Sequence, residues 1–90
     1  MKKVIVTVVG RDTIGIIAKI CTYFAEKGIN ILDISQTIVS GYFNMMMIVD
    51  TGNASVEFTE MAAELETVGT GIGVQVKCQK EEIFDSMHRI

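Results

Sequence analysis

The spacing of hydrophobic residues changes from segment to segment along the chain, and each spacing predicts an element of secondary structure. Residues 3–9 are nearly all β-branched and apolar at consecutive positions, which predicts a strand at the centre of a sheet. From Ile14 onward the apolar residues recur at helical spacing. Asp12 is the expected N-cap of this helix and Gly28 the residue that follows its end, which gives a helix of about 15 residues.

The middle of the chain predicts a β-hairpin. Residues 29–39 alternate apolar and polar side chains, which predicts a strand with one covered face and one polar face. The covered face is expected to carry Leu32, Ile34 and Ile38. A tight reversal is expected at residues 40–42, after which residues 43–50 return as the partner strand.

The last part of the chain predicts a second helix, a fourth strand and a short terminal helix. Ser55 is the expected N-cap of the second helix, which ends at Gly69. Its apolar stripe is expected to contain Phe58, Met61, Ala62, Leu65 and Val68. Residues 71–80 alternate apolar and polar side chains and predict a strand. Residues 81–90 are amphipathic, and a helix this short needs another surface to dock on.

These elements follow one another in the order strand, helix, strand, strand, helix, strand. Two right-handed crossovers in this order form the ferredoxin-like α+β sandwich, a βαββαβ fold with a four-stranded antiparallel sheet and both helices on one face. We expect a single domain over residues 1–90, with a core at 1–80 and a helical tail at 81–90. The other face of the sheet then stays bare. Together with a hydrophobic content of 49% in 90 residues, this bare face predicts self-association.

The charge distribution argues against nucleic acid as a partner. The chain has 8 Lys and Arg against 11 Asp and Glu, and its only adjacent basic pair is Lys2-Lys3. Binding to a phosphate backbone needs several cations on one face. The chain passes directly from residues 1–3 into the first strand, and no apolar run approaches the roughly 20 residues that span a bilayer. We therefore expect a cytoplasmic protein that binds no membrane.

We expect no metal centre and no cofactor. His88 is the only histidine, and the sequence places no nucleophile or orienting carboxylate beside it. Residues 45–47 are three methionines in a row, and neighbours in a strand point to opposite faces, so the three cannot bind one ion. Cys21 and Cys78 lie in apolar periodic segments without metal-ligand spacing, and we expect both to be reduced, buried hydrophobic residues.

One segment does have the features of a binding site: residues 10–16, Gly-Arg-Asp-Thr-Ile-Gly-Ile, join the first strand to the first helix. The first N–H groups of a helix lack an intrahelical partner, and the helix dipole adds partial positive charge, so such a site accepts a carboxylate or phosphate. Gly10 permits a sharp turn. Gly15 has two interpretations: a ligand approaches the backbone closely, or a tight helix–strand contact leaves no room for a Cβ. The glycine spacing matches neither a P-loop nor a dinucleotide-binding motif.

A second candidate is the stretch at residues 28–31, Gly-Ile-Asn-Ile, where the first helix leads into the second strand. The amide of Asn30 offers both hydrogen-bond donors and an acceptor. Asparagine is also a common turn residue. The residues alone leave both interpretations of Asn30 open.

At these two places the sequence resembles the ACT domain, a small regulatory module that binds amino acids. The resemblance covers the whole chain. It rests on the loop with Gly15, on Ile-Ile-Ala-Lys-Ile in the first helix and on Lys-Gly-Ile-Asn-Ile at residues 27–31. Within the family, the ending Glu-Glu-Ile-Phe-Asp-Ser-Met-His-Arg-Ile at residues 81–90 is similar to that of the stand-alone UPF0237 group. The chain is also similar to the ACT repeats of glycine-cleavage regulators.

The resemblance implies a homodimer in which two sheets join side by side and an amino acid binds at the subunit interface. The implied ligand-binding residues are Arg11, Asp12, Thr13, Ile14, Gly15 and Ile16 of one subunit with Asn30, Ile31 and Leu32 of the other. Backbone N–H groups of residues 13–16 would hold the carboxylate, with Arg11 closing over it. Asn30 would bond the carboxylate or the ammonium group, and Asp12 would either cap the helix or pair with the ammonium. Ile14 stands where many ligand-binding members have proline.

Three functions are compatible with the sequence. The first is a regulatory module that binds an amino acid and signals to an unidentified protein. The second is a module for ligand-independent oligomerisation or for docking on a protein partner. The third is an enzyme, because acylphosphatases share this fold and use a loop arginine with an asparagine, to which Arg11 and Asn30 invite comparison. Their phosphate-cradling motif is absent from residues 10–16. We therefore expect a regulatory module and not an enzyme.

Overall fold

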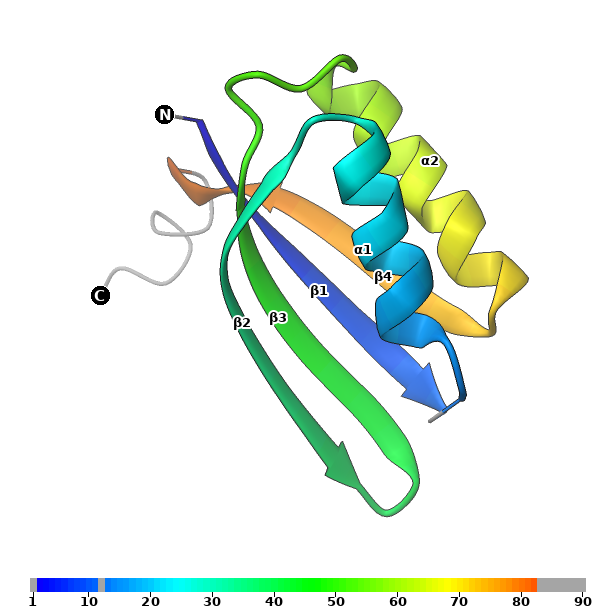
Figure 1. The fold of residues 1–90 in the computed structure, drawn as a ribbon. Coiled ribbons are helices and arrows are strands. Elements are labelled where there is room, and N and C mark those ends of the chain that lie inside the picture. The colour runs from blue at the N-terminus through cyan, green and yellow to red at the C-terminus, as the bar shows by residue number, and fades with distance from the viewer. Residues whose placement is uncertain (1, 12, 83–90) are drawn as a thin grey trace.

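The structure, a computed structural model, describes residues 2–11 and 13–82 and has the expected βαββαβ order (Figure 1). Its elements are β1 (Lys3–Arg11), α1 (Ile16–Glu26), β2 (Asn30–Val39), β3 (Tyr42–Asp50), α2 (Phe58–Gly71) and β4 (Val74–Lys80). The strands form one antiparallel sheet in the order β2-β3-β1-β4, and both helices cover the same face. The ferredoxin-like fold is confirmed. The helix expected at 81–90, with His88, lies outside the described residues from residue 83 onward.

β1 occupies an inner position in the sheet, as its apolar side chains on both faces predict. It pairs with β3 along its whole length, from Lys3↔Asp50 at one end to Arg11↔Tyr42 at the other. It pairs with β4 over residues 4–10. The start of β1 therefore lies beside the end of β3, and the end of β1 lies beside the β2–β3 turn.

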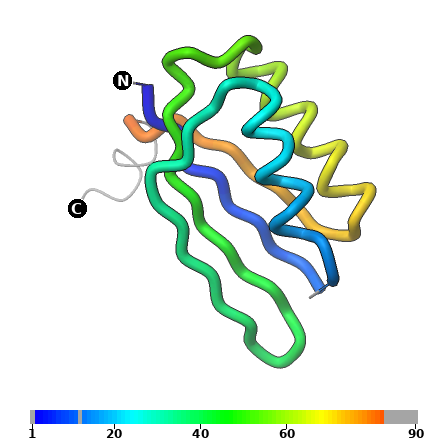
Figure 2. Tube along the Cα trace, viewed as in Figure 1, coloured from blue at the N-terminus to red at the C-terminus, as the bar shows by residue number. Residues whose placement is uncertain are grey.

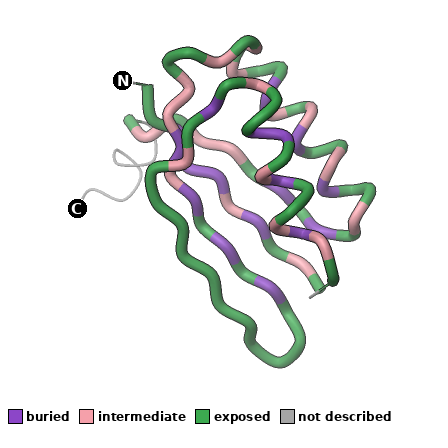
Figure 3. Tube along the Cα trace, viewed as in Figure 1, coloured by how far each residue is buried: buried purple, intermediate pink, exposed green. Residues whose placement is uncertain are grey.

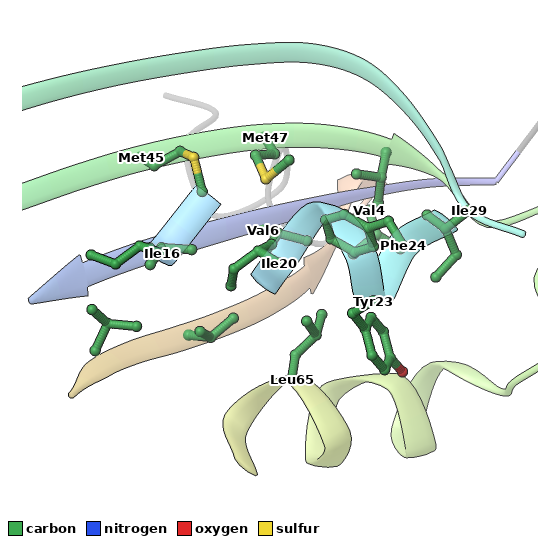
Figure 4. Packing of buried hydrophobic residues seen from close by; sticks show 14 of the residues in the cluster. Val4, Val6, Ile16, Ile20, Tyr23, Phe24, Ile29, Met45, Met47 and Leu65 are labelled. Atoms are coloured by element: carbon green, nitrogen blue, oxygen red, sulfur yellow. The ribbon is translucent and has the colours of Figure 1, made fainter. Parts of the chain in front are cut away.

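The hydrophobic core fills the space between the sheet and the two helices (Figure 4). It includes Val4, Val6 and Val8 of β1, Ile20 and Phe24 of α1, Met45 and Met47 of β3, Leu65 of α2 and Val76 of β4. Burial of each large side chain stabilises the fold by roughly 1.5–3 kcal/mol. Met46 is exposed between its two buried neighbours, so the expected alternation of the three methionines is confirmed. Among the described residues, no polar or charged residue is buried.

The start of α1 differs from the prediction. The helix begins at Ile16, and its N-cap is Gly15 in a left-handed backbone conformation, with φ +92°. Because the chain cannot be helical through this conformation, the helix cannot begin near residue 12, and the expectation that Asp12 caps it is wrong. Asp12 itself lies outside the described residues. The expected end is confirmed, since Gly28 follows the C-cap and has φ +72°.

The start of α2 also differs from the prediction. Its N-cap is Glu57, and Ser55 lies in the preceding loop. The backbone N–H of Ser55 donates to the carbonyl oxygen of Lys27 at 2.9 Å, which ties this loop to the end of α1. The helix continues past Gly69 to Gly71, so β4 begins three residues later than predicted, at Val74.

β2 differs most from its prediction, because the alternating pattern predicts a covered face and the strand is exposed at nearly every position. A β-bulge shifts its pairing with β3 between Ile31 and Asp33, so Leu32 has no partner in the register. The face expected to be covered is open, because Ile34 is 44% exposed and Ile38 57% exposed. The hairpin of β2 and β3 extends past the helices, and its outer strand is exposed along nearly its whole length (Figures 2 and 3).

Gly10 does not make a turn, because β1 continues through it to Arg11. A Cβ at Gly10 would lie 2.8 Å from both the Cα and the Cγ1 of Val74, and 2.9 Å from the carbonyl oxygen of Gly73. The glycine therefore permits the start of β4 to approach β1 closely.

Replacement of Gly10 by alanine is expected to destabilise the fold by about 1–3 kcal/mol, because the backbone of β4 would have to move away. Chemical denaturation measures this change. Gly71→Ala is the matched control, because a Cβ at this helical position meets nothing within 4 Å. A Gly10→Ala variant as stable as Gly71→Ala would contradict the close approach.

Candidate ligand-binding site

The loop between β1 and α1 leads into a helix end that no side chain of residues 2–11 and 13–82 caps. The N-cap residue makes no side-chain hydrogen bond to the helix, and the first turn contains no acidic residue. The backbone N–H of Lys19 makes the first intrahelical bond, to the carbonyl oxygen of Gly15 at 3.0 Å. The N–H groups of residues 16–18 therefore have no partner within the helix. Such a helix end can accept a carboxylate or phosphate group.

Gly15 is required by its backbone conformation and not by close packing. A Cβ built at Gly15 would meet no atom within 4 Å, which excludes the tight helix–strand contact as its reason. Its φ of +92° is one that residues with a Cβ rarely adopt. The space beside the Gly15 Cα is open to an approaching group.

The other described loop residues have different surroundings. The hydroxyl of Thr13 donates to the carbonyl oxygen of Arg11 at 3.2 Å. The side chain of Ile14 is fully exposed at the tip of the loop. Ile16 is buried in the core, so its backbone N–H and not its side chain faces the loop. Asp12 lies outside the described residues.

Arg11 lies on the sheet face opposite the helices. Val8 faces the helices, and Arg11 is three positions further along the strand, so its side chain points the other way. The guanidinium carbon lies 5.9 Å from the ring centroid of Tyr42, within range of a cation–π interaction. The described conformation thus does not bring Arg11 toward the N–H groups of α1. The sequence predicts Tyr42 only as part of the reversal at residues 40–42. Its contact with Arg11 depends on the register of β1 and β3, which hydrophobic spacing does not give.

The second candidate stretch lies at the opposite end of the sheet from this loop. Asn30 is the first residue of β2 and pairs with Asp50, which also pairs with Lys3 at the start of β1. The loop follows Arg11, which is eight positions further along β1 (3 to 11), or roughly 26 Å at the rise of a strand. Asn30, Ile31 and Leu32 therefore cannot share one site with residues 11–16 of the same chain.

The two edges of the sheet differ in how they discourage pairing with another strand. β4 carries Lys77 and Lys80 and packs beneath α2. β2 has one charged residue, Asp33, and its outer side is free within the described chain. Natural proteins protect exposed edges with lysines, bulges or covering elements. Beyond its bulge, the edge of β2 has little such protection.

Shifted pKa values occur away from the loop. The hydroxyl of Tyr23 donates to Glu64 Oε1 at 2.6 Å and joins α1 to α2. Burial, and then this carboxylate, raise the pKa of Tyr23 well above its usual value. Burial raises the pKa of the Cys78 thiol to about 11. Cys21 and Cys78 are free and half-buried against the core. Both shifted groups belong to the packing of the fold.

Among residues 2–11 and 13–82, no three His, Cys, Asp or Glu side chains gather where they could hold a metal ion. No helix in this part of the chain is long and apolar enough to cross a membrane.

Comparison with known proteins identifies the family. The sequence profile of the ACT domain matches residues 2–79. Over 90 residues the chain is 60% identical to a UPF0237 protein of Bifidobacterium longum and 51% identical to one of Methanocaldococcus jannaschii, with 100% of each chain covered. An ACT domain protein from Streptococcus pneumoniae has a TM-score of 0.82 at 40% identity, covering 97% of this chain and 98% of its own.

A more distant likeness concerns the fold alone. A proposed glycine cleavage system transcriptional repressor has a TM-score of 0.74 at 20% identity, over 88% of this chain and 45% of its own. The chain belongs to the ACT domain family. Its similarity along the whole chain places it with the UPF0237 proteins in that family.

Gly15→Ala is expected to destabilise the protein by about 1–2 kcal/mol, because alanine is strained in the left-handed region. Gly15→Asn should cost clearly less, since asparagine tolerates that region better than other residues with a Cβ. Thermal denaturation of the two variants separates backbone strain from crowding. Equal losses for alanine and the larger asparagine would contradict the backbone explanation.

Proposed function

We propose that this chain is a regulatory module that binds an amino acid as a homodimer, without catalysis, in the cytoplasm. The ligand lies between residues 10–16 of one subunit and the start of β2 of the other. The observation that carries the proposal is the separation of these two segments to opposite ends of one sheet. Antiparallel pairing of β2 with β2 of a second copy would bring the start of one strand to the end of the other.

The regular part of β2 restricts how two copies can pair. Directly opposed residues of an antiparallel pair point to the same face, so a two-fold axis must pass through a residue and not between two residues. Residues 33–39 follow the bulge without interruption, and Gln36 is their midpoint. An axis at Gln36 pairs every residue of this stretch. An axis at Asp33 would place two carboxylates opposite each other, which is unfavourable.

Pairing about Gln36 matches the side chains on both faces. On the helix-facing side, Ile34 lies opposite the partner subunit's Ile38, and both residues are exposed in the single chain. On the other side, Ser35 lies opposite the partner subunit's Thr37. The apolar pair and the hydroxyl pair are both cross-strand combinations that stabilise sheets. Two such Ile–Ile contacts flank the axis.

The same pairing would complete the ligand site. Counting back through the bulge, the partner subunit's Asn30 comes beside the β2–β3 turn, at the sheet end where β1 meets α1. Three strand spacings, about 14 Å, separate it from the end of β1. An amino acid could then place its carboxylate on the free N–H groups at the start of α1 and another polar group on Asn30. Since Gly15 holds the capping position, Asp12 is assigned to the ligand ammonium.

Ligand binding across this interface would stabilise the dimer by mass action. The change in assembly would then be read by another, unidentified protein. The family supports a regulatory role, and a proposed transcriptional repressor of the glycine cleavage system shares the fold. Ligand-independent assembly is the second candidate function, favoured by exposed Val9 and Met46 on the bare sheet face.

Isothermal titration with each proteinogenic amino acid is expected to give saturable heat for at least one of them. Asn30→Ala should weaken that binding by about tenfold, because one hydrogen bond from the partner is lost. Asn44→Ala, at an exposed position of the inner strand β3, is the matched control and should bind normally. Absence of binding at millimolar amino-acid concentrations would contradict the ligand-binding part of the proposal.

Ile38→Lys is expected to raise the dimer dissociation constant about tenfold or more, because it places a charge in both apolar contacts beside the axis. Gln75→Lys on the other edge of the sheet is the control. Sedimentation equilibrium measures both. A dimer that tolerates Ile38→Lys would exclude pairing through β2, whatever the outcome of ligand titration.

A further inference from the structure

The sheet face opposite the helices is covered at one end and open at the other. Ile5 and Val9 of β1 both point to this face, because they alternate with the valines that face the helices. Ile5 is 5% exposed, whereas Val9 is 46% exposed. On the neighbouring strand β3 the same change occurs, since Ile48 is partly buried and Met46 is exposed. The cover lies over the end of the face where β1 begins.

The packing between the sheet and the helices does not explain the burial of Ile5. The hydrophobic core cluster does not include this residue, and α1 and α2 lie on the other side of the sheet (Figure 1). Ile5 pairs with Ile48 on one side and with Gln79 on the other. Strand neighbours flank a side chain but leave the surface above it open. Another part of the same chain must therefore lie above Ile5, because it is buried in a single copy.

The chain leaves the sheet directly beside Ile5. β4 ends at Lys80, and the residue before it, Gln79, is the partner of Ile5. Glu81 Oε2 then lies 4.0 Å from Lys3 Nζ, and Lys3 points to the same face as Ile5. An exposed ion pair at this distance adds little stability. It does show that the chain turns toward the face opposite the helices after β4.

The next segment, residues 83–90, has the pattern and the length to cover this end of the face. Residues 81–82 are already helical. If the helix continues, the apolar residues that follow fall on one side of it, namely Ile83, Phe84, Met87 and Ile90. Eight helical residues span about 12 Å. From β4 to β3 is two strand spacings, about 10 Å, so such a helix can cross above both Ile5 and Ile48.

We propose that residues 83–90 pack as an amphipathic helix on the sheet face opposite α1 and α2, with their apolar side over Ile5 and Ile48. A helix this short is not stable alone in water, and the sheet supplies the surface that it needs. The docked segment closes one half of the face to a second copy of the chain and leaves the half with Val9 and Met46 open. The proposal does not depend on the amino-acid site, which uses the edge of β2 and the start of α1.

The first test is NOE spectroscopy of the intact protein with labelled methyl groups. The ring of Phe84 is expected to give NOEs to the methyl groups of Ile5 and Ile48. Met87→Gln should abolish these NOEs, because a polar side chain would have to give up its water to lie on the sheet. Arg89→Gln is the matched control and should retain them, since Arg89 lies on the opposite side of the helix.

The second test changes the sheet in place of the segment. Ile5→Thr and Val9→Thr both keep a β-branched residue on the same strand and face. Ile5→Thr is expected to weaken the NOEs between Phe84 and Ile48, and Val9→Thr should leave them unchanged. The amide spectrum of each variant reports whether the rest of the fold is retained.

Three results would overturn the proposal. The first is absence of NOEs between residues 83–90 and either isoleucine. The second is equal loss of the NOEs in Met87→Gln and Arg89→Gln, which would show that the apolar side does not make the contact. The third comes from an isotope-filtered experiment on a mixture of labelled and unlabelled protein. NOEs found only between chains would show that the segment of a second copy covers Ile5.

Discussion

The pairing of β1 with β3 on one side and with β4 on the other fixes the positions of all other parts of the fold. β1 is apolar at consecutive positions, which suits an inner strand with a partner on each of its two edges. Val4, Val6 and Val8 then face the helices and define the centre of the core. Gly10 lets β4 approach β1 without a Cβ between them, so the two strands remain paired as far as Gly10 and Val74.

The end of β1 leads through Gly15 into the start of α1, which no described side chain caps. This region has backbone N–H groups and an open approach to Gly15, but it lacks a second wall within the chain. The proposed site therefore needs another subunit to be complete.

The edge of β2 connects the fold to the proposed regulatory role. A strand with exposed Ile34 and Ile38, and with one charge along its length, is more stable when another strand covers it. A second copy of the chain presents the same β2 edge and can supply that strand. If ligand and partner strand meet at one interface, each stabilises the other, and the protein responds to an amino acid without changing it chemically.

By itself the sequence determined the order of the elements, the inner position of β1 and the presence of a loop between β1 and α1, because hydrophobic spacing and glycines act locally. Its resemblance to the ACT domain supplied the family. Only the tertiary structure decided that Gly15 caps α1 in place of Asp12, that Arg11 lies over Tyr42, and that Asn30 is far from the loop. These outcomes depend on backbone conformation and strand register, which arise from contacts between residues distant in the sequence.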